Sequence, residues 1–215
     1  PFAPRSFGFY GNSPTLLRAR PAVGHITPRV ESDGILRKLP AVICGPGQIP
    51  QVSLPLAVLW RAAQPESGAQ GAAVPDWQWQ TRTSPLGGND GFGASYALTS
   101  PSLPGVVVPL DADGNLRVPY GLARSAFISI PASDILRGRF DARLLKGALV
   151  LVGATAFGLS DTVSTPLSAV SSGIEVHAQT LAGLLDRRIP YTPAIWPLLQ
   201  GAVTLLLAGL LIAVA

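Results

Sequence analysis

The stretch Leu145–Leu185, LKGALVLVGATAFGLSDTVSTPLSAVSSGIEVHAQTLAGLL, decides the fold. Its apolar run, Ala148–Val152, is short and lies between Gly147 and Gly153. A run of this length between glycines is typical of a strand buried in a parallel sheet, where both faces are covered. We therefore predict an α/β domain with three layers, built around a mainly parallel sheet with β-hairpin additions.

A helix is expected behind this strand. Ser172 and Glu175 have the spacing of a capping box, with Ser172 as the N-cap and Glu175 as the third helical residue. Helical periodicity then places several residues close to one face: Ile174, His177, Leu181, Leu184 and Leu185. The unit is a strand, a polar loop and a helix, and open α/β sheets usually keep their sites at such a strand end.

Polar side chains gather at this strand end and helix start, and we treat them as a candidate ligand site. They are Thr155, Asp161, Thr165, Glu175, His177 and Gln179. The positive end of the helix would stabilise Asp161 or an anionic group of a ligand nearby. In the alternative interpretation these residues tie the loop to the helix. Replacing His177 distinguishes the two, because a structural role predicts loss of folded protein and a ligand site predicts folded protein with altered function.

The same stretch resembles a CHASE2 domain, an extracytoplasmic sensory module found in front of bacterial adenylate cyclases, histidine kinases and diguanylate cyclases. The pieces that carry the resemblance are Gly153-Ala154-Thr155, Asp161, Thr165-Pro166 and Gly173-Ile174-Glu175-Val176-His177-Ala178. The resemblance extends from about His25 to Arg188. It implies a domain between one N-terminal membrane helix and typically three C-terminal ones, which passes an unidentified external signal to a cyclase or kinase output domain.

Composition excludes several classes of protein. The net charge is +4, and the Lys and Arg residues are scattered, which does not favour a nucleic-acid groove. Cys44 is the single cysteine, so the sequence holds neither a disulfide framework nor a Cys-based zinc site. We expect no metal and no cofactor. The chain begins with Pro1 and contains no Met, so we interpret it as a fragment.

Residues 1–24 are rich in Pro, Gly and Arg and are predicted to be an irregular N-terminal remnant before a domain over residues 25–190. Within this domain, Asp33-Gly34 and Asp113-Gly114 predict two β-hairpins, because Asp-Gly readily supplies the positive φ of a type I′ turn. Both turns share the pattern Asp-Gly-x-Leu-Arg. The two hairpins are therefore expected to be similar.

The rest of the domain carries weaker signals. Residues 53–63 predict a helix with Ser53 near its N-cap and a stripe of apolar side chains, which are Leu56, Leu59 and Trp60. Residues 64–104, rich in Gly, Pro, Ser and Ala, are predicted to be a long surface insertion with a short strand near Trp77 and Trp79. Phe127–Ile130 predicts a further strand.

Residues 194–215 contain no charged residue and predict a transmembrane helix. About 20 apolar residues span a hydrocarbon core of about 30 Å. Tyr191 and Trp196 lie where interfacial aromatic residues are common. We expect this helix to continue beyond the end of the sequence. Arg187 and Arg188 precede it on the domain side, against the positive-inside rule, so the orientation rests on the resemblance.

Two binding motifs are incomplete. Asp111, Asp113 and Asn115 have the spacing of EF-hand calcium ligands, but the glycine comes too early and Leu122 stands where the bidentate Glu belongs. Gly153–Gly158 has glycines at the spacing of a phosphate-binding loop but lacks the Lys that meets the phosphates. A hairpin turn and a tight strand-to-loop turn are the better interpretations.

We therefore predict a sensory domain without catalytic residues, anchored in the cell inner membrane and facing the periplasm or the outside. Its expected partners are a small molecule or a physical signal, membrane lipid and a second copy of the receptor, but no nucleic acid. One alternative is a membrane-anchored extracytoplasmic enzyme of hydrolase type, which needs Asp161 and His177 within hydrogen-bond distance beside an open pocket. Another is a structural dimerisation module with a large apolar patch and no pocket.

Overall fold

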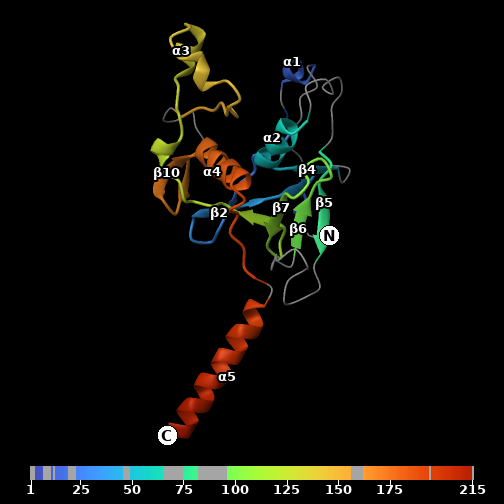
Figure 1. Ribbon diagram of the computed structural model, residues 1–215, viewed down its shortest axis with the longest axis vertical. Helices are drawn as coiled ribbons and strands as arrows, with labels where there is room; N and C mark the ends of the chain where they lie inside the picture. Colours follow the sequence, from blue (N-terminus) through green and yellow to red (C-terminus); the bar gives the residue numbers. More distant parts are fainter. Residues whose placement is uncertain are drawn as a thin grey trace.

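The structure, a computed structural model, describes residues 3–6, 11, 13–18, 23–45, 49–64, 75–81, 96–155, 162–193 and 195–214. It has a mixed α/β fold, as predicted at this coarse level. Helices α2 (Leu54–Ala62) and α4 (Gly173–Leu185) pack side by side beside the strands, and α5 (Trp196–Val214) projects away from the rest of the molecule (Figure 1). The remaining helical segments are α1 (Pro14–Leu17), α3 (Ala132–Leu136) and the 3-10 turns Arg124–Ala126 and Ala142–Leu144.

The described strands form small sheets. One sheet has the order β1-β2-β8, and another has the order β5-β6-β7, while β3 pairs with β4 and β9 with β10. The bounds are β1 (Arg29–Val30), β2 (Leu36–Pro40), β3 (Val42–Cys44), β4 (Pro50–Val52), β5 (Gln78–Thr81), β6 (Tyr96–Thr99), β7 (Val107–Leu110), β8 (Asn115–Arg117), β9 (Thr162–Thr165) and β10 (Ser168–Ser172). All these pairs are antiparallel.

The predicted mainly parallel sheet is therefore wrong. Parallel contacts among the described residues are isolated bridges, which join Arg5 to Cys44, His25 to Ser53 and Ile35 to Ser164. The reason lies in the connections, because a parallel pair needs a crossover of about a dozen residues or more. The connections from β1 to β2, from β3 to β4 and from β9 to β10 are only a few residues long, and such short connections permit only antiparallel pairing.

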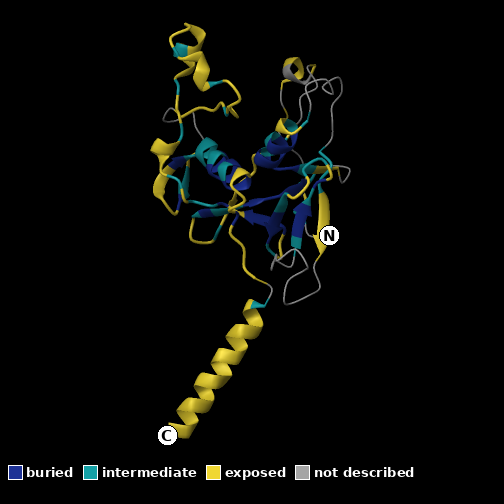
Figure 2. Ribbon diagram, viewed as in Figure 1, coloured by how far each residue is buried: buried dark blue, intermediate teal, exposed yellow. Residues whose placement is uncertain are grey.

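The two segments predicted as further strands are not strands in the structure. Ala148–Val152 pairs with no described strand and is largely exposed, with Val152 at 84%. Phe127–Ile130 is irregular, and Ile128 is also exposed. Both edges of the central strand β2 are already hydrogen-bonded to β1 and β8, so the apolar run finds no edge there. Figure 2 shows this outer part of the chain, around α3, as exposed.

Turns form at both predicted Asp-Gly pairs, but only the glycine of each pair has a positive φ, so neither is the predicted type I′ turn. Gly34 and Gly114 have φ values of 80° and 78°, which a residue with a side chain rarely adopts. The first turn closes the β1–β2 hairpin. The second leads from β7 into β8, but β8 pairs with β2 instead of returning along β7. The second turn therefore lies at the C-terminal end of β2, opposite the first turn, and Arg29 of β1 contacts Asp113 there over 3.2 Å.

The predicted helix at residues 53–63 is confirmed as α2, with Ser53 at the N-cap position and Pro55 in its first turn. Its buried side chains include the predicted stripe of Leu56, Leu59 and Trp60. Within the segment 64–104, the described part contributes β5 and β6. Ala97 and Leu98 of β6 are fully buried, so this part of the segment belongs to the core.

The core lies between α2, α4 and the strands they cover. Its most deeply buried apolar side chains come from several elements: Leu36, Leu39, Leu56, Leu98, Val108, Leu116 and Val176. In α4 the buried face includes Val176, His177 and Leu184 but not Leu185, which is 54% exposed. The helix is therefore rotated slightly from the face that its sequence pattern predicts.

Helix α4 ends in a tight turn before the chain runs toward α5. Arg187 has a φ of 55°, in the left-handed region, and the amide of Arg188 donates to the carbonyl of Gly183 over 2.8 Å. This is the hydrogen bond of a Schellman motif, with Arg187 where glycine is usual. The turn directs Ile189 back into the core, where it is 8% exposed. The end of α4 is thus held firmly before α5 begins.

Candidate functional site

A large cavity lies beside the N-terminus of α4. Its volume is about 870 Å3, within the range of pockets that bind small molecules. One wall comes from the β1–β2 hairpin and the start of α2, through side chains such as Val30, Leu36 and Leu54. The other comes from β9, α4 and the chain segment 152–154. Among the described residues of the predicted ligand site, His177 lines this cavity.

His177 brings the strongest polar feature to this cavity. It lines the cavity and is only 7% exposed, and its Nδ1 atom has no hydrogen-bond partner. Burial lowers the pKa of His177, so the ring is neutral at pH 7. A buried nitrogen without a partner carries an energetic cost. A ligand that donates or accepts a hydrogen bond there would remove this cost.

His25 lies close to His177, although the two are far apart in the sequence. Burial, together with the nearby His177, lowers the pKa of His25 to about 4. The nearby Pro40 carbonyl acts in the opposite direction and raises the pKa of His25 slightly. Neither ring nitrogen of His25 makes a hydrogen bond. The backbone of His25 is pinned to the start of α2, since its amide donates to Val52 and its carbonyl accepts from Leu54. The sequence did not suggest this pair, because only the fold brings the two histidines together.

Two of the predicted site residues hold a neighbouring chain segment against α4. Glu175 forms an ion pair with Arg124 over 2.7 Å instead of closing a capping box. Gln179 is buried, and its amide group donates to the Leu122 carbonyl over 2.6 Å and accepts from the Leu122 amide over 3.3 Å. Ser172 occupies the N-cap position but makes no capping hydrogen bond. The contacts of Glu175 with Arg124 and of Gln179 with Leu122 hold the segment that follows β8 against α4.

Two other predicted residues, Thr155 and Thr165, are not among the residues that line the cavity. Thr165 is buried in the β9–β10 hairpin, where its hydroxyl lies 3.2 Å from that of Ser171. Thr155 is exposed and follows the cavity-lining segment 152–154. Asp161 lies outside the described residues. The β9–β10 hairpin was missed, although alternating Thr, Val and Ser residues in TVST are a usual strand signal.

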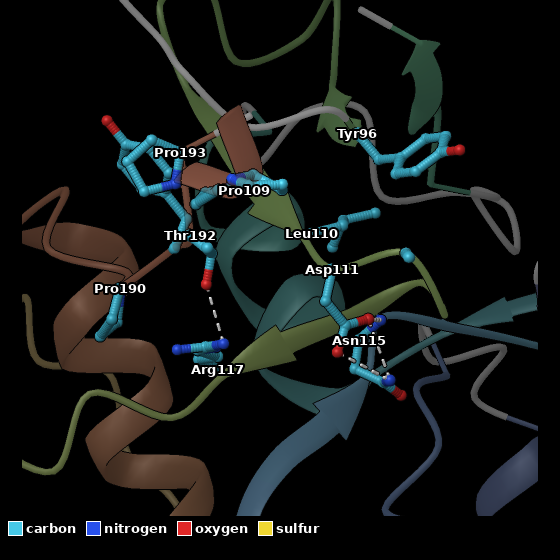
Figure 3. A pocket seen from close by; sticks show the side chains of 12 residues that line it. Tyr96, Pro109, Leu110, Asp111, Asn115, Arg117, Pro190, Thr192 and Pro193 are labelled. Carbon is cyan, nitrogen blue, oxygen red and sulfur yellow. Dashed lines mark hydrogen bonds between the residues drawn. The ribbon is translucent and has the colours of Figure 1, made fainter. Parts of the chain in front are cut away.

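A second, smaller cavity of about 200 Å3 lies between the body of the domain and the base of α5 (Figure 3). Residues of β7, β8 and the turn between them line one side, and the segment 190–193 lines the other together with Pro197 of α5. Arg117 of β8 donates to the Thr192 hydroxyl over 3.0 Å across this junction. Asp111 accepts from the amide of Asn115 over 2.8 Å and contacts Lys38 over 3.1 Å, which holds the turn in place.

Neither cavity carries a metal-binding arrangement in the described part of the chain. No group of three His, Cys, Asp or Glu side chains comes together among those residues. The large cavity instead combines apolar walls, two neutral histidines nearby and the start of a helix. Such a site can bind and orient a small molecule, with apolar contacts for most of it and hydrogen bonds for one end.

Helix α5 is long and apolar enough to cross a membrane. Its mean hydropathy is 2.1 over the most apolar window, and none of that window is buried against the rest of the chain. Figure 2 shows the helix exposed along its whole length. Such a run of exposed Leu, Ile and Val side chains is costly in water and favourable in lipid.

Comparison with known proteins identifies one family. The family model described as CHASE2 domain matches residues 6–214, which is nearly the whole chain. No curated protein and no solved structure matches. The match covers the cavity at α4, the junction cavity and α5.

Proposed function

Because the chain belongs to the CHASE2 domain family, we propose that it is the extracytoplasmic sensory part of a membrane-bound bacterial receptor. In this proposal an external signal changes the domain, and α5 carries the change through the membrane to a cyclase or kinase output domain elsewhere in the receptor. The family is sensory and not catalytic, which favours a non-enzymatic role for this chain. The signal is a small molecule or a physical change, and the output activity lies outside these residues.

The observation that carries this proposal is the firm connection between the domain and α5. Ile189 is buried in the core, and Thr192 accepts the hydrogen bond from Arg117 shortly before α5 begins at Trp196. A shift of α4 or β8 would therefore act directly on the base of α5. A flexible, unattached linker would absorb such a shift. The short, Pro-containing joint favours transmission of small rigid-body movements.

Localisation and assembly follow from the same proposal. The domain faces the periplasm or the outside, α5 lies in the inner membrane in contact with lipid, and the receptor works as a homodimer. A dimer would let two copies of α5 move against each other, which is a common way to pass small displacements through a membrane. The exposed apolar surface of α5 supports contact with lipid or with another helix.

The placement of the domain can be tested by cysteine labelling in intact cells. Cys44 is first replaced by Ser, and the exposed Ser133 is then replaced by Cys in the full-length receptor. A maleimide that cannot cross the inner membrane is expected to label Ser133→Cys from outside. Labelling only after the inner membrane is broken would place the domain in the cytoplasm and overturn the proposal. A cytoplasmic protein with one exposed cysteine controls for leakage.

The transmission step can be tested separately. A flexible Gly-Ser insert after Pro193 of the full-length receptor should uncouple the domain from α5. The expected result is an output activity that no longer responds to the domain, with normal receptor abundance in the membrane. An insert of the same length after Gly138, in the exposed segment beyond α3, is the matched control. An unchanged response with the insert at Pro193 would contradict transmission through this joint.

A further inference from the structure

The large cavity at α4 has mostly apolar walls. The apolar lining side chains come from β2, α2, β9 and α4, and they include Leu36, Leu39, Leu54, Val163, Ile174 and Val176. Leu36, Leu39 and Val176 are almost completely buried, so these walls belong to the folded core and not to a loose surface. A ligand with an aliphatic body would gain about 25 cal/mol for each Å2 of apolar surface removed from water.

The polar groups of the cavity lie at one end. The start of α4 is there, with Ser172, Gly173 and Ile174 among the lining residues. The N-cap side chain of Ser172 accepts no hydrogen bond from the first amides of this 13-residue helix. Its hydroxyl donates to the Ala154 carbonyl at 3.4 Å. The free amides and the helix dipole favour an anionic group at this position.

His177 is a second, independent feature at the same end. It lies on the first turns of α4, lines the cavity and keeps its Nδ1 atom buried without a partner. The described lining residues include no Asp, Glu, Lys or Arg. A cationic ligand would therefore find no counter-charge in these walls, and a sugar would find too few hydrogen-bonding groups.

We propose that this cavity binds an aliphatic monocarboxylate, with its carboxylate at the start of α4 beside His177 and its chain along the wall formed by β2 and α2. The proposal rests on the sensory function proposed above and names the chemical class of the signal. Binding would tie α4 to the β1–β2 hairpin across the cavity. Since the far end of α4 leads to the joint before α5, the ligand would bias the element that transmits the signal.

The binding test uses the full chain in lipid nanodiscs and three probes with the same aliphatic chain: octanoate, octanol and octylamine. Calorimetric titration is expected to show saturable binding of octanoate, weaker binding of octanol and none of octylamine beyond that of empty nanodiscs. Equal binding of all three would show that the head group is not recognised and would overturn the proposal. Absence of octanoate binding would overturn it as well.

A pair of variants locates the site. Ala154→Trp would fill the cavity from an exposed backbone position and should weaken octanoate binding at least tenfold. Ala148→Trp makes the same change at an exposed residue outside the lining and should leave binding unchanged. His177→Phe should weaken octanoate binding while octanol binding is kept. Unchanged octanoate binding by Ala154→Trp would place any binding elsewhere and contradict the proposal.

The apolar run Ala148–Val152 is an alternative occupant of the cavity. Hydrogen exchange of its amides distinguishes this alternative from octanoate binding. Most of the run is exposed, and its last residue, Val152, lines the cavity together with Gly153 and Ala154. If the run itself filled the cavity, its amides would be protected from hydrogen exchange in the ligand-free protein, and octanoate would not bind. We expect fast exchange there without octanoate. Failure of this binding test leaves the labelling and insertion tests of the sensory role unaffected, so the two proposals can fail separately.

Discussion

The guanidinium of Arg117 in β8 donates a hydrogen bond to the hydroxyl of Thr192 over 3.0 Å, and so joins the central sheet to the segment that leads into α5 (Figure 3). The two residues are far apart in the sequence. Their contact is exposed, so it adds little to the stability of the fold. The contact lies at the junction of the domain and α5, and this position suits a role in passing a change in the domain to α5.

We expect Arg117→Ala and Thr192→Val to change the signalling output of the full-length receptor in the same direction. Each removes one partner of the same hydrogen bond, so the double variant should resemble either single variant. The free energy of unfolding should change by about 0.5 kcal/mol or less, as for most surface changes. Output activity and thermal unfolding of the same preparations provide the measurement.

The control for this pair is Arg143→Ala. Arg143 is 90% exposed and pairs with Asp141 on the outer segment, far along the chain from the joint. It should alter neither output nor stability. Additive effects of Arg117→Ala and Thr192→Val on output would show that the two residues act independently and would argue against the hydrogen bond as a link.

Asp76 anchors the β5–β6–β7 sheet to α2, and its removal should destabilise the domain. Its carboxylate accepts from the Trp60 indole over 2.7 Å, from the Ser102 hydroxyl over 2.6 Å and from the Ser100 hydroxyl. Burial raises the pKa of Asp76, but these hydrogen bonds together outweigh burial and leave the pKa below its usual value. Hydrogen bonds to charged groups contribute about 1.5–3 kcal/mol each to stability.

We therefore expect Asp76→Ala to lower the free energy of unfolding by about 2 kcal/mol or more in urea denaturation. Because the folded-state pKa is depressed, the stabilisation is present above the unfolded pKa and is lost as pH falls through the folded value. Asp113→Ala is the matched control, since Asp113 makes an exposed ion pair with Arg29. Equal losses for the two variants would contradict an anchoring role of Asp76.

The parts of the fold that the sequence predicts well are those fixed by local chemistry. The Asp33-Gly34 and Asp113-Gly114 turns need positive φ, which only a few residue types adopt, so the pattern is specific. Helix α2 has an N-cap, a proline in its first turn and an apolar stripe, and these agree with one another. The prediction of helix α5 depends only on the length and the hydropathy of its sequence. None of these predictions depends on distant residues.

The wrong predictions concern which strands pair. A short apolar run such as Ala148–Val152 favours burial, but it does not identify a partner or the direction of pairing. The partner depends on which edges are free, and in this structure β1 and β8 occupy both edges of β2. The candidate site shows the same limit. His177 lines the cavity, but its neighbours His25 and Leu36 come from distant parts of the chain.

The His25–His177 pair should make stability depend on pH. Burial lowers the pKa of His25 to about 4, and His177 contributes to this shift, whereas an unfolded histidine has a pKa of about 6.5. Below about pH 6.5 the unfolded chain therefore binds a proton that the folded domain does not bind. Stability is highest above that pH and falls as the pH is lowered toward 4, by on the order of 3 kcal/mol.

Unfolding by urea at several pH values between 4 and 8 would measure this loss. His25→Gln should flatten the dependence over this range, because Gln does not titrate. The remaining slope should come from His177, whose pKa burial also lowers. A slope in the His25→Gln variant equal to that of the unchanged protein would show that His25 is accessible to protons in the folded state.

The close contact between α4 and Pro119 gives a prediction for the end of the helix. A Cβ atom built on Gly183 would lie 2.1 Å from Cγ of Pro119 and 3.3 Å from Cδ1 of Ile189. Pro119 is held in a short turn, since the Gly121 amide donates to its carbonyl over 2.7 Å. The neighbours therefore cannot move away easily. Gly183→Ala should lower the free energy of unfolding by about 1–3 kcal/mol, although Ala is the better helix former.

A matched control and a second variant separate this clash from a general effect of added methyl groups. A Cβ atom on Gly121 would have its nearest contact at 3.9 Å, so Gly121→Ala should be close to neutral. Adding Pro119→Ala to Gly183→Ala should recover part of the lost stability, because it removes the ring carbon that clashes. Thermal unfolding of the four proteins would show this coupling. Since Gly183 lies six residues before Ile189, near the joint to α5, we also expect Gly183→Ala to shift the output of the full-length receptor. A destabilised variant with unchanged output would show that the end of α4 does not act on α5.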